Sequence, residues 1–211
     1  MSSPVSITIA SPLGPLEIEG GPQGVRAIRL LRPPGSPPAG AGASDEGFRP
    51  LTTSPGPVQG AAAPQDIPVP VREAAEQLSD YFSGRRRRFD FALDLRGTPF
   101  QVAVWNCLMA IPFGETRSYR WVAQAVGRPA ALRAVGAAVG RNPLLIAVPC
   151  HRVIASDGTL GGFACGLDVK RLLLRLEGLD AVASMRSRLE PGRRLHAGAR
   201  QGALELEGGT P

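Results

Sequence analysis

One long stretch of this sequence cannot form a packed core, and it limits how the remainder can fold. Within residues 33–70, proline and glycine supply 16 of the 38 residues. Such a composition buries too little apolar surface to offset the entropy lost when a chain is ordered. We therefore expect a flexible insertion here, with folded structure before and after it.

A small sheet is predicted before the insertion and a helix after it. Apolar runs at residues 5–10, 16–19 and 25–31 are separated by turns containing proline and glycine. This spacing predicts a three-stranded antiparallel meander. Beyond residue 70, apolar side chains recur with helical spacing up to Gly84, which predicts a helix. Its apolar face comprises Val71, Ala74, Leu78 and Phe82.

The next segment combines a charge run with an alternating pattern. Residues 85–88 are four arginines. Because a charge run between two structured elements is most often solvated, we interpret it as a turn in preference to a DNA-binding patch. Phe89, Phe91, Leu93 and Leu95 then alternate with other residues, which predicts a strand.

The clearest helix signal in the chain begins at Thr98. Thr98 can serve as N-cap, Pro99 suits the first helical position, and Gln101 completes a capping box. Pro112 and Gly114 end the helix. The apolar stripe of this helix comprises Phe100, Val104, Leu108 and Ile111.

A pair of short helices is predicted next. Ser118 can cap a helix over residues 119–126 that ends at Gly127, and Pro129 opens another that runs to about Val139. Two short helices with a tight joint form a helix-turn-helix pattern, although most such pairs are only packing units. The charge around them favours a role in DNA binding, because residues 116–156 contain six arginines and no acidic residue. These are Arg117, Arg120, Arg128, Arg133, Arg141 and Arg152.

Cys150 is the candidate nucleophile of the chain. Cysteines are most often small buried hydrophobes, so position alone does not assign a function. Here Pro149 stiffens the backbone, and the imidazole of His151 and the guanidinium of Arg152 would favour the thiolate. The apolar run at residues 144–148 predicts a buried strand or buried turn leading into the thiol. Residues 167–176 predict a last helix, followed by Glu177.

Composition excludes several classes of protein. The 211 residues suffice for one large domain or two small ones, and the net charge of +6 suits a partner that carries phosphate. Three cysteines, two histidines and no C-x-x-C motif argue against a disulfide framework and a structural zinc site. Neither a signal-peptide pattern nor an apolar stretch of membrane-spanning length occurs, which predicts a cytoplasmic location.

Taken together, these motifs resemble those of one family, the O6-alkylguanine-DNA alkyltransferases, also called methylated-DNA–protein-cysteine methyltransferases. The similarity is strong over residues 97–178 and weak over residues 11–14. It is carried by Gly97-Thr-Pro-Phe-Gln101, Ile111-Pro-Phe-Gly-Glu-Thr-Arg-Ser-Tyr119, Arg133-Ala-Val-Gly136, Asn142-Pro143, Pro149-Cys-His-Arg-Val153, Gly158-Thr-Leu-Gly-Gly-Phe163 and Leu176-Glu-Gly178.

The resemblance implies a chemical role for each of five residues. Cys150 would accept the alkyl group from O6 of guanine and keep it as a thioether. His151 would take the thiol proton through a water, and Glu177 would orient the imidazole. Asn142 would brace the turn behind the site. Tyr119 would lie at the pocket and help to turn the nucleotide out of the duplex.

The resemblance also implies DNA-binding and pocket residues. Arg133 would enter the base stack and fill the gap, while Tyr119, Arg120 and Ser156 would complete the DNA-binding set. Cys165 stands where the family more often has glycine, so its side chain would take space from bulky adducts. The pocket residues implied are Val153, Gly161, Phe163, Ala164 and Cys165.

The implied fold class is α/β, of the α+β kind. A sheet-plus-helix domain similar to ribonuclease H would span residues 1–96, including the insertion at 33–70. A helical, winged-helix-like domain with the helix-turn-helix would span residues 97–178. Residues 179–211, which lack periodicity, are expected to form a mobile tail.

The implied function is repair of DNA by direct reversal of damage. The chain would act once, irreversibly, on O6-alkylguanine flipped out of double-stranded DNA, with O4-alkylthymine as a second candidate substrate. Neither a cofactor nor a metal would take part. We expect a monomer that binds no membrane and lies in the cytoplasm, associated with the nucleoid when bound to DNA.

Two other classes of function remain open. A non-enzymatic binder of alkylated DNA would lack the reactive cysteine, so Cys150 argues against it. A thiol hydrolase with a Cys-His pair would need an oxyanion hole and has no use for the arginine-rich helix pair.

Overall fold

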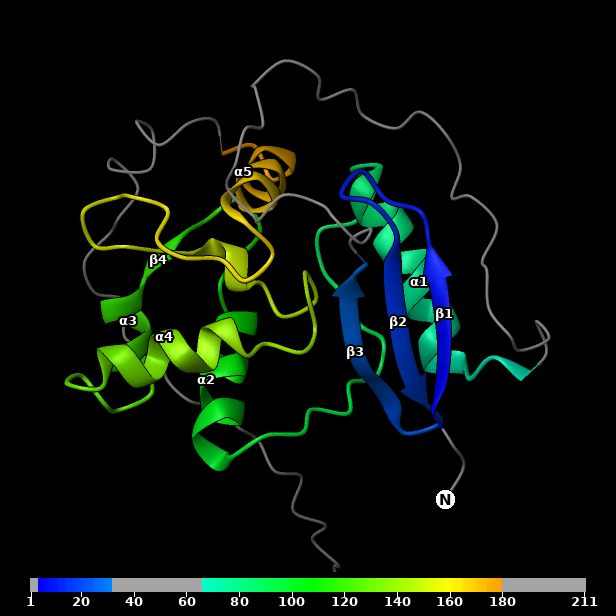
Figure 1. The fold of residues 1–211 in the computed structure, drawn as a ribbon, viewed down its shortest axis with the longest axis horizontal. Coiled ribbons are helices and arrows are strands. Elements are labelled where there is room, and N and C mark those ends of the chain that lie inside the picture. Colours follow the sequence, from blue (N-terminus) through cyan, green and yellow to red (C-terminus); the bar gives the residue numbers. More distant parts are fainter. Residues whose placement is uncertain (1–3, 32–65, 180–211) are drawn as a thin grey trace, which may run out of the picture.

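The structure is a computed structural model that describes residues 4–31 and 66–179. The predicted flexible insertion, apart from residues 66–70, and nearly all of the predicted tail lie outside these ranges. Figure 1 shows a sheet with one helix on one side of the molecule and a group of helices on the other. The fold is therefore mixed α and β, with a small antiparallel sheet and five α-helices among the described residues.

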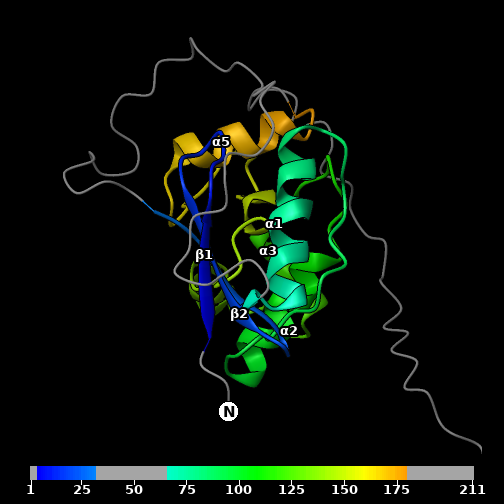
Figure 2. The same ribbon diagram turned by 90° about the vertical axis from the view of Figure 1, so that its right-hand side faces the viewer.

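The N-terminal sheet has the predicted meander topology. Strands β1 (Val5–Ile9), β2 (Leu16–Gly21) and β3 (Gly24–Leu30) pair antiparallel in the order β1-β2-β3. Buried residues alternate along β1 and β2, and helix α1 (Val69–Phe82) covers one face of the sheet (Figures 1 and 2). The helix begins at Val69, inside the range predicted as insertion, because Pro70 fits its first turn.

The strand predicted over residues 89–95 is wrong. Only Leu93 makes a bridge, in parallel with Val25 of β3, through hydrogen bonds of 2.8 Å on either side. The segment pairs with β3 only at this point, near the start of the strand. It approaches so closely that a Cβ at Gly24 would lie 2.8 Å from the carbonyl oxygen of Ala92. The alternation instead reflects packing, since Phe91 is buried while Asp90 is exposed.

The arginine run before this segment is a solvated turn, as predicted. Arg85 pairs with Asp80 at 2.7 Å, and Arg86 pairs with Asp90 at 3.5 Å. Such exposed pairs contribute little to stability, about 0–1 kcal/mol each. The turn therefore connects α1 to the second half of the chain without anchoring it.

The second half begins with the helix that the capping box predicts. In α2 (Pro99–Met109), Thr98 accepts from the Gln101 backbone and the Gln101 side chain accepts from the Thr98 backbone. Ser118 likewise caps α3 (Tyr119–Ala125). The final helix α5 (Leu167–Leu176) has the predicted bounds.

Helix α4 (Leu132–Gly140) starts three residues later than predicted. The backbone N–H of Ala131 donates to the carbonyl of Arg128 at 2.9 Å, so residues 128–131 form a turn. Pro129 therefore lies inside that turn and does not open the helix. The α3–α4 joint is consequently longer than the sequence pattern suggested.

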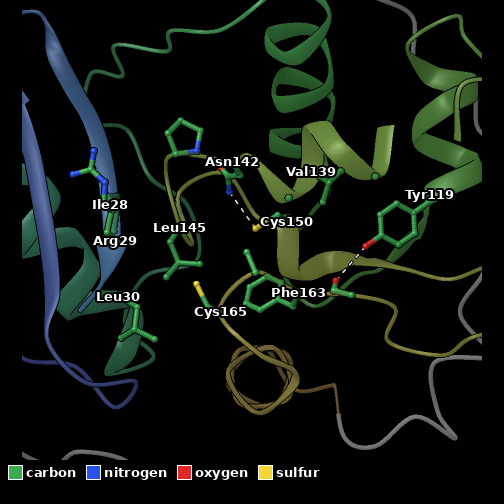
Figure 3. A pocket seen from close by; sticks show the side chains of 15 residues that line it. Ile28, Arg29, Leu30, Tyr119, Val139, Asn142, Leu145, Cys150, Phe163 and Cys165 are labelled. Carbon is green, nitrogen blue, oxygen red and sulfur yellow. Dashed lines mark hydrogen bonds between the residues drawn. The ribbon is translucent and has the colours of Figure 1, made fainter. Parts of the chain in front are cut away.

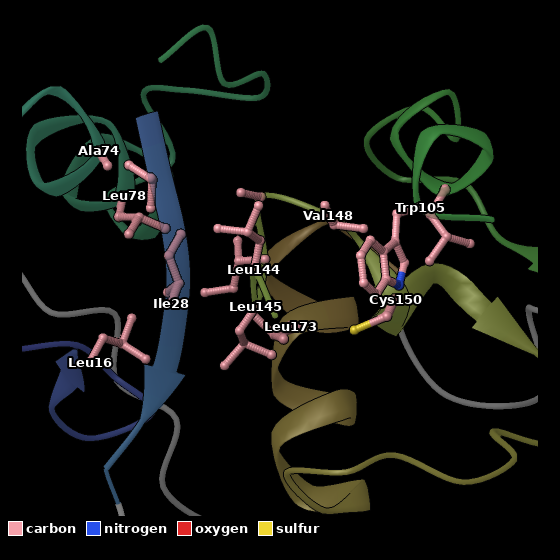
Figure 4. Close-up of a cluster of buried hydrophobic side chains, with 14 of the residues drawn as sticks. Leu16, Ile28, Ala74, Leu78, Trp105, Leu144, Leu145, Val148, Cys150 and Leu173 are labelled. Carbon is pink, nitrogen blue, oxygen red and sulfur yellow. The ribbon is translucent and has the colours of Figure 1, made fainter. Parts of the chain in front are cut away.

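One core joins the two halves of the molecule. The free edge of β3 is covered by the chain after α4: Ile28 donates to Pro143 at 2.9 Å, and Leu145 donates to Ile28 at 3.2 Å. Figure 4 shows Leu78 and Ile28 on the sheet side facing Leu144 and Leu145, with further core residues beyond them. The chain leading to Cys150 is thus anchored on the sheet.

Residues 144–148 form the buried turn that was one of the two predicted alternatives. Leu145 and Val148 bridge each other, and Ile146 between them has φ of +74°. Positive φ is unusual for a β-branched residue and costs on the order of 1–3 kcal/mol.

No helix in the described ranges is both long enough and apolar enough to cross a lipid bilayer.

Candidate active site

Cys150 opens a single 3-10 turn, Cys150–Arg152, directly after Pro149. Its side chain is buried, with the residue 6% exposed. The amide of Asn142 donates to the carbonyl of Val148 at 2.7 Å and lies 3.1 Å from Sγ of Cys150. Asn142 therefore both fastens the strained turn and touches the sulfur (Figure 3).

The environment of Cys150 does not favour the thiolate, contrary to the sequence expectation. Burial raises the pKa of the Cys150 thiol to about 11, and the hydrogen bond from Asn142 only partly offsets this. The neighbouring side chains fail to help because both His151 and Arg152 turn away to Glu177. At neutral pH the sulfur carries its proton, so any reaction at Cys150 needs a base.

His151, the residue after Cys150, has a ring nitrogen that can accept a proton. Its Nε2 lies 2.8 Å from Oε1 of Glu177, and both side chains are fully buried. Burial lowers the pKa of His151, although hydrogen bonding to Glu177 opposes the shift. A neutral ring that donates from Nε2 leaves Nδ1 as an acceptor, and Nδ1 has no hydrogen-bond partner among the described residues.

Glu177 is held as a carboxylate. Burial opposes its ionisation, but hydrogen bonds from His151 and Arg152 outweigh that effect and lower the pKa of Glu177 to about 2. Arg152 grips both carboxylate oxygens, through Nε at 2.9 Å and Nη2 at 2.8 Å. Its third nitrogen donates to the carbonyl of Ile111 at 2.6 Å.

Two members of this cluster were not identified from the sequence. Arg152 was expected to favour the thiolate of Cys150, but its pairing with Glu177 was not predicted. Tyr81 of α1 donates to Oε1 of Glu177 at 2.9 Å across 96 positions of sequence. No local pattern could reveal that contact.

A cavity of about 660 Å3 lies in front of the thiol. Six of the predicted site residues line it, namely Tyr119, Asn142, Cys150, Phe163, Ala164 and Cys165. Figure 3 shows Asn142, Tyr119, Phe163 and Cys165 around Cys150, with the sulfur of Cys165 pointing into the space. Sequence reasoning missed the contribution of β3, from which Ile28, Arg29 and Leu30 line the cavity, and that of α4, which adds Gly136, Val139 and Gly140.

Two predicted pocket residues do not line this cavity. Val153 is fully buried beneath it, and its carbonyl accepts a hydrogen bond from Lys170 at 2.5 Å. Gly161 supports the cavity wall instead. It has φ of +65°, and a Cβ there would lie 3.1 Å from the ring of Tyr119, whose hydroxyl donates to Gly162 at 3.3 Å.

Lys170 is a further buried group that the sequence did not single out. It is 0% exposed, and its ammonium donates to the carbonyls of Val153 and Leu160. Burial lowers the pKa of Lys170 to about 8. The residue pins the start of the 153–166 loop to α5, so it holds the wall that carries Phe163.

The residues predicted to contact DNA lie on the surface. Arg120, Arg133 and Ser156 are exposed and do not line the cavity. Arg133 precedes Gly136 by three positions on α4, so both lie on the same side of that helix. Within residues 4–31 and 66–179, no cluster of three or more His, Cys, Asp or Glu side chains could hold a metal ion.

Comparison with known proteins identifies the family. Residues 99–179 match the family described as 6-O-methylguanine DNA methyltransferase, DNA binding domain. A methylated-DNA–protein-cysteine methyltransferase of Methanosarcina barkeri is 57% identical over 106 residues, which are 50% of this chain and 67% of the relative. The enzyme of the same name from Mycobacterium tuberculosis strain H37Rv is 42% identical over 178 residues, covering 84% of this chain and 94% of the relative.

The fold comparison agrees with the sequence comparison. The crystal structure of Mycobacterium tuberculosis OGT in complex with DNA superposes with a TM-score of 0.62 at 38% identity, covering 87% of this chain and 94% of that one. The similarity extends over nearly the whole length of these relatives, and so includes the sheet as well as the helical half. The chain belongs to the family of methylated-DNA–protein-cysteine methyltransferases.

Proposed function

We propose that this chain repairs DNA by moving the alkyl group of O6-alkylguanine onto Sγ of its own Cys150. The observation that carries the proposal is that Cys150 lines the cavity, while His151, the next residue in the chain, is fully buried and pairs with Glu177 at 2.8 Å. In the reaction a sulfur–carbon bond forms and the carbon–O6 bond breaks. The thiol proton ends on the guanine, so atoms and charges balance.

A thiol whose pKa is about 11 is protonated at neutral pH, and in our proposal His151 removes that proton. Its neutral ring takes the proton at Nδ1 through a bridging water, while Glu177 stabilises the imidazolium that forms. The pair is already aligned, because Arg152 fixes the carboxylate at two points. Asn142 keeps the sulfur in place through its amide.

Base flipping brings the target to this sulfur. O6 of a paired guanine is not accessible to a buried thiol, so the nucleotide must leave the stack at a cost of a few kcal/mol. In our proposal Tyr119 at the cavity assists that rotation, and Arg133 on α4 fills the gap left in the duplex. Arg120 and Ser156 bind the DNA backbone, which suits recognition of damage in any sequence context.

The remaining features follow from the same chemistry and from the family. A thioether has no easy leaving group, so the chain acts once and without a cofactor. O4-alkylthymine is a second candidate substrate because it presents a similar alkyl-oxygen group.

We assign residues 1–96 to a ribonuclease H-like domain and residues 97–178 to a winged-helix-like domain with a helix-turn-helix. The protein would act as a monomer in the cytoplasm, on the nucleoid.

Mass spectrometry after incubation with an O6-methylguanine duplex tests the proposal. One methylene should appear on the peptide containing Cys150, with a stoichiometry of one per chain. Cys150→Ser should abolish the transfer, while Cys107→Ser should not. Multiple turnovers per chain, or sustained ester hydrolysis, would favour a thiol hydrolase. Binding of alkylated DNA without transfer would favour a non-enzymatic damage binder.

A further inference from the structure

The carboxylate of Glu177 is saturated with donors from four residues. Oε1 accepts from His151 at 2.8 Å, from Arg152 at 2.8 Å and from Tyr81 at 2.9 Å. Oε2 accepts from Arg152 at 2.9 Å and from the backbone N–H of Gly114 at 3.2 Å. Tyr81 is the member that comes from the sheet side of the molecule, and it shares the very oxygen that holds the imidazole.

The ring of Tyr81 is held by aromatic packing. The residue is 2% exposed, and its ring packs against Phe82, Phe89 and Phe113 with centroids 5.5, 5.6 and 6.2 Å away. Burial, followed by the charge of Glu177, raises the pKa of Tyr81 well above its usual range. The hydroxyl therefore stays protonated and acts as a donor at neutral pH.

We propose that Tyr81 is a positioning residue for alkyl transfer, because its hydroxyl takes up part of the charge on Oε1 of Glu177 and so limits how firmly that carboxylate holds a proton on His151. This inference rests on the proposed function, in which neutral His151 is the base. A carboxylate with too few donors would favour the imidazolium, and a protonated ring cannot accept the thiol proton. Tyr81 thereby makes α1 part of the active site.

The sign of the effect is fixed by the chemistry. Removing the hydroxyl leaves Oε1 with two donors, so its negative charge acts more strongly on the Nε2 proton of His151. The pKa of His151 then rises, and a smaller fraction of the enzyme holds the neutral ring at a given pH. The acid limb of the rate profile must move to higher pH. A residue that only packs would change the amount of folded protein and leave the position of that limb unchanged.

The test is the pH dependence of single-turnover alkyl transfer from free O6-benzylguanine, which needs no duplex and no base flipping. For Tyr81→Phe, which keeps the ring contacts, we expect the midpoint of the acid limb to rise by about half a pH unit or more. The matched control is Val71→Ala. Val71 is fully buried on the same helix, ten residues or about 15 Å before Tyr81, so this variant is weakened in α1 while its acid limb stays at the parent's pH.

Two results would overturn the positioning role: an acid limb in Tyr81→Phe that coincides with the parent's, or an equal shift in Val71→Ala. His151→Ala separates this outcome from a failure of the proposed function. If that variant loses the acid limb while Tyr81→Phe leaves it in place, only the role of Tyr81 is refuted. If His151→Ala keeps the limb and the rate, the proposed base itself is wrong, and the inference about Tyr81 falls with it.

Discussion

The two sides of the Cys150 turn are built on opposite principles. Behind the turn, His151, Arg152 and Glu177 are buried, and the first two are both hydrogen-bonded to the carboxylate of Glu177 at 2.8–2.9 Å. In front of it lies an open cavity with mainly apolar walls. The cluster behind the turn is packed and hydrogen-bonded like a protein interior, whereas the cavity in front has room for a ligand.

Because of this difference, we expect the buried cluster and the cavity wall to have different roles. A buried ionic cluster contributes little net stability, because desolvation consumes most of the Coulomb attraction, but it is very sensitive to the loss of one partner. An apolar cavity wall, by contrast, tolerates changes of volume and alters what fits. Substitutions behind Cys150 should therefore affect both folding and rate, and substitutions in front should affect substrate choice.

Glu177→Gln should have the largest effect, because it breaks the rear cluster at its centre. Arg152 would be left buried without a counter-charge, which typically costs about 3–5 kcal/mol. His151 would also lose the carboxylate that stabilises its protonated form, so we expect transfer to slow by roughly a hundredfold or more. Denaturant unfolding and single-turnover kinetics measure the two losses.

The matched control is Asp94→Asn, which breaks the solvent-accessible pairs with Arg26 and Arg96, whose side chains are 34% and 63% exposed. It should cost no more than about 1 kcal/mol and leave the rate unchanged.

Acid unfolding measures the contribution of Glu177 to stability in a second way. The folded pKa of Glu177 is depressed to about 2, so its contribution is complete above the unfolded value near 4.5 and disappears as pH falls towards 2. Glu177→Gln should flatten that part of the curve, and an unchanged curve would contradict the charged cluster.

Much of the rear cluster could be predicted from the sequence, and the part that could not is informative. Local patterns singled out Cys150 and the adjacent His151, whereas Glu177, which directly follows a clear amphipathic helix, was assigned to the site only by the resemblance to the family. Tyr81 reaches them only because α1 packs against the sheet and the sheet edge carries the 144–148 turn. A contact that depends on α1 packing on the sheet, and on the sheet pairing with the 144–148 turn, produces no periodic pattern in the sequence.

The errors in secondary structure have local causes. The alternation of residues 89–95 was typical of a strand, but only Leu93 lies beside β3 long enough to pair. Pro129 suited a helix start, yet Arg128 and Ala131 close a turn around it. In both segments the residue pattern fits more than one backbone, and packing against β3 or α3 decides between them.

Arg133→Ala sharpens the comparison from outside both regions. Arg133 is exposed and does not line the cavity, so the variant should fold normally and react with free O6-benzylguanine at the parent rate. Repair of an O6-methylguanine duplex should slow about tenfold or more, because only the duplex requires base extrusion. Arg85→Ala, on the solvated turn, is the control. An equal loss on both substrates would move Arg133 from DNA intercalation to a role in folding.

Cys165→Gly should have the smallest effect, and it tests the front wall alone. Cys165 lines the cavity with its sulfur towards the same space as Cys150, but no imidazole follows it in sequence to act as its base. We therefore expect it to limit volume and not to accept the alkyl group. The variant should react severalfold faster with O6-benzylguanine and repair O6-methylguanine at nearly the parent rate, since removing a side chain from an open wall leaves no closed void. Competition kinetics with the two substrates measures the ratio directly. A strong loss of methyl repair, or an alkyl group found on residue 165 of the parent protein, would show that the front wall takes part in the chemistry and that the division between the two sides is wrong.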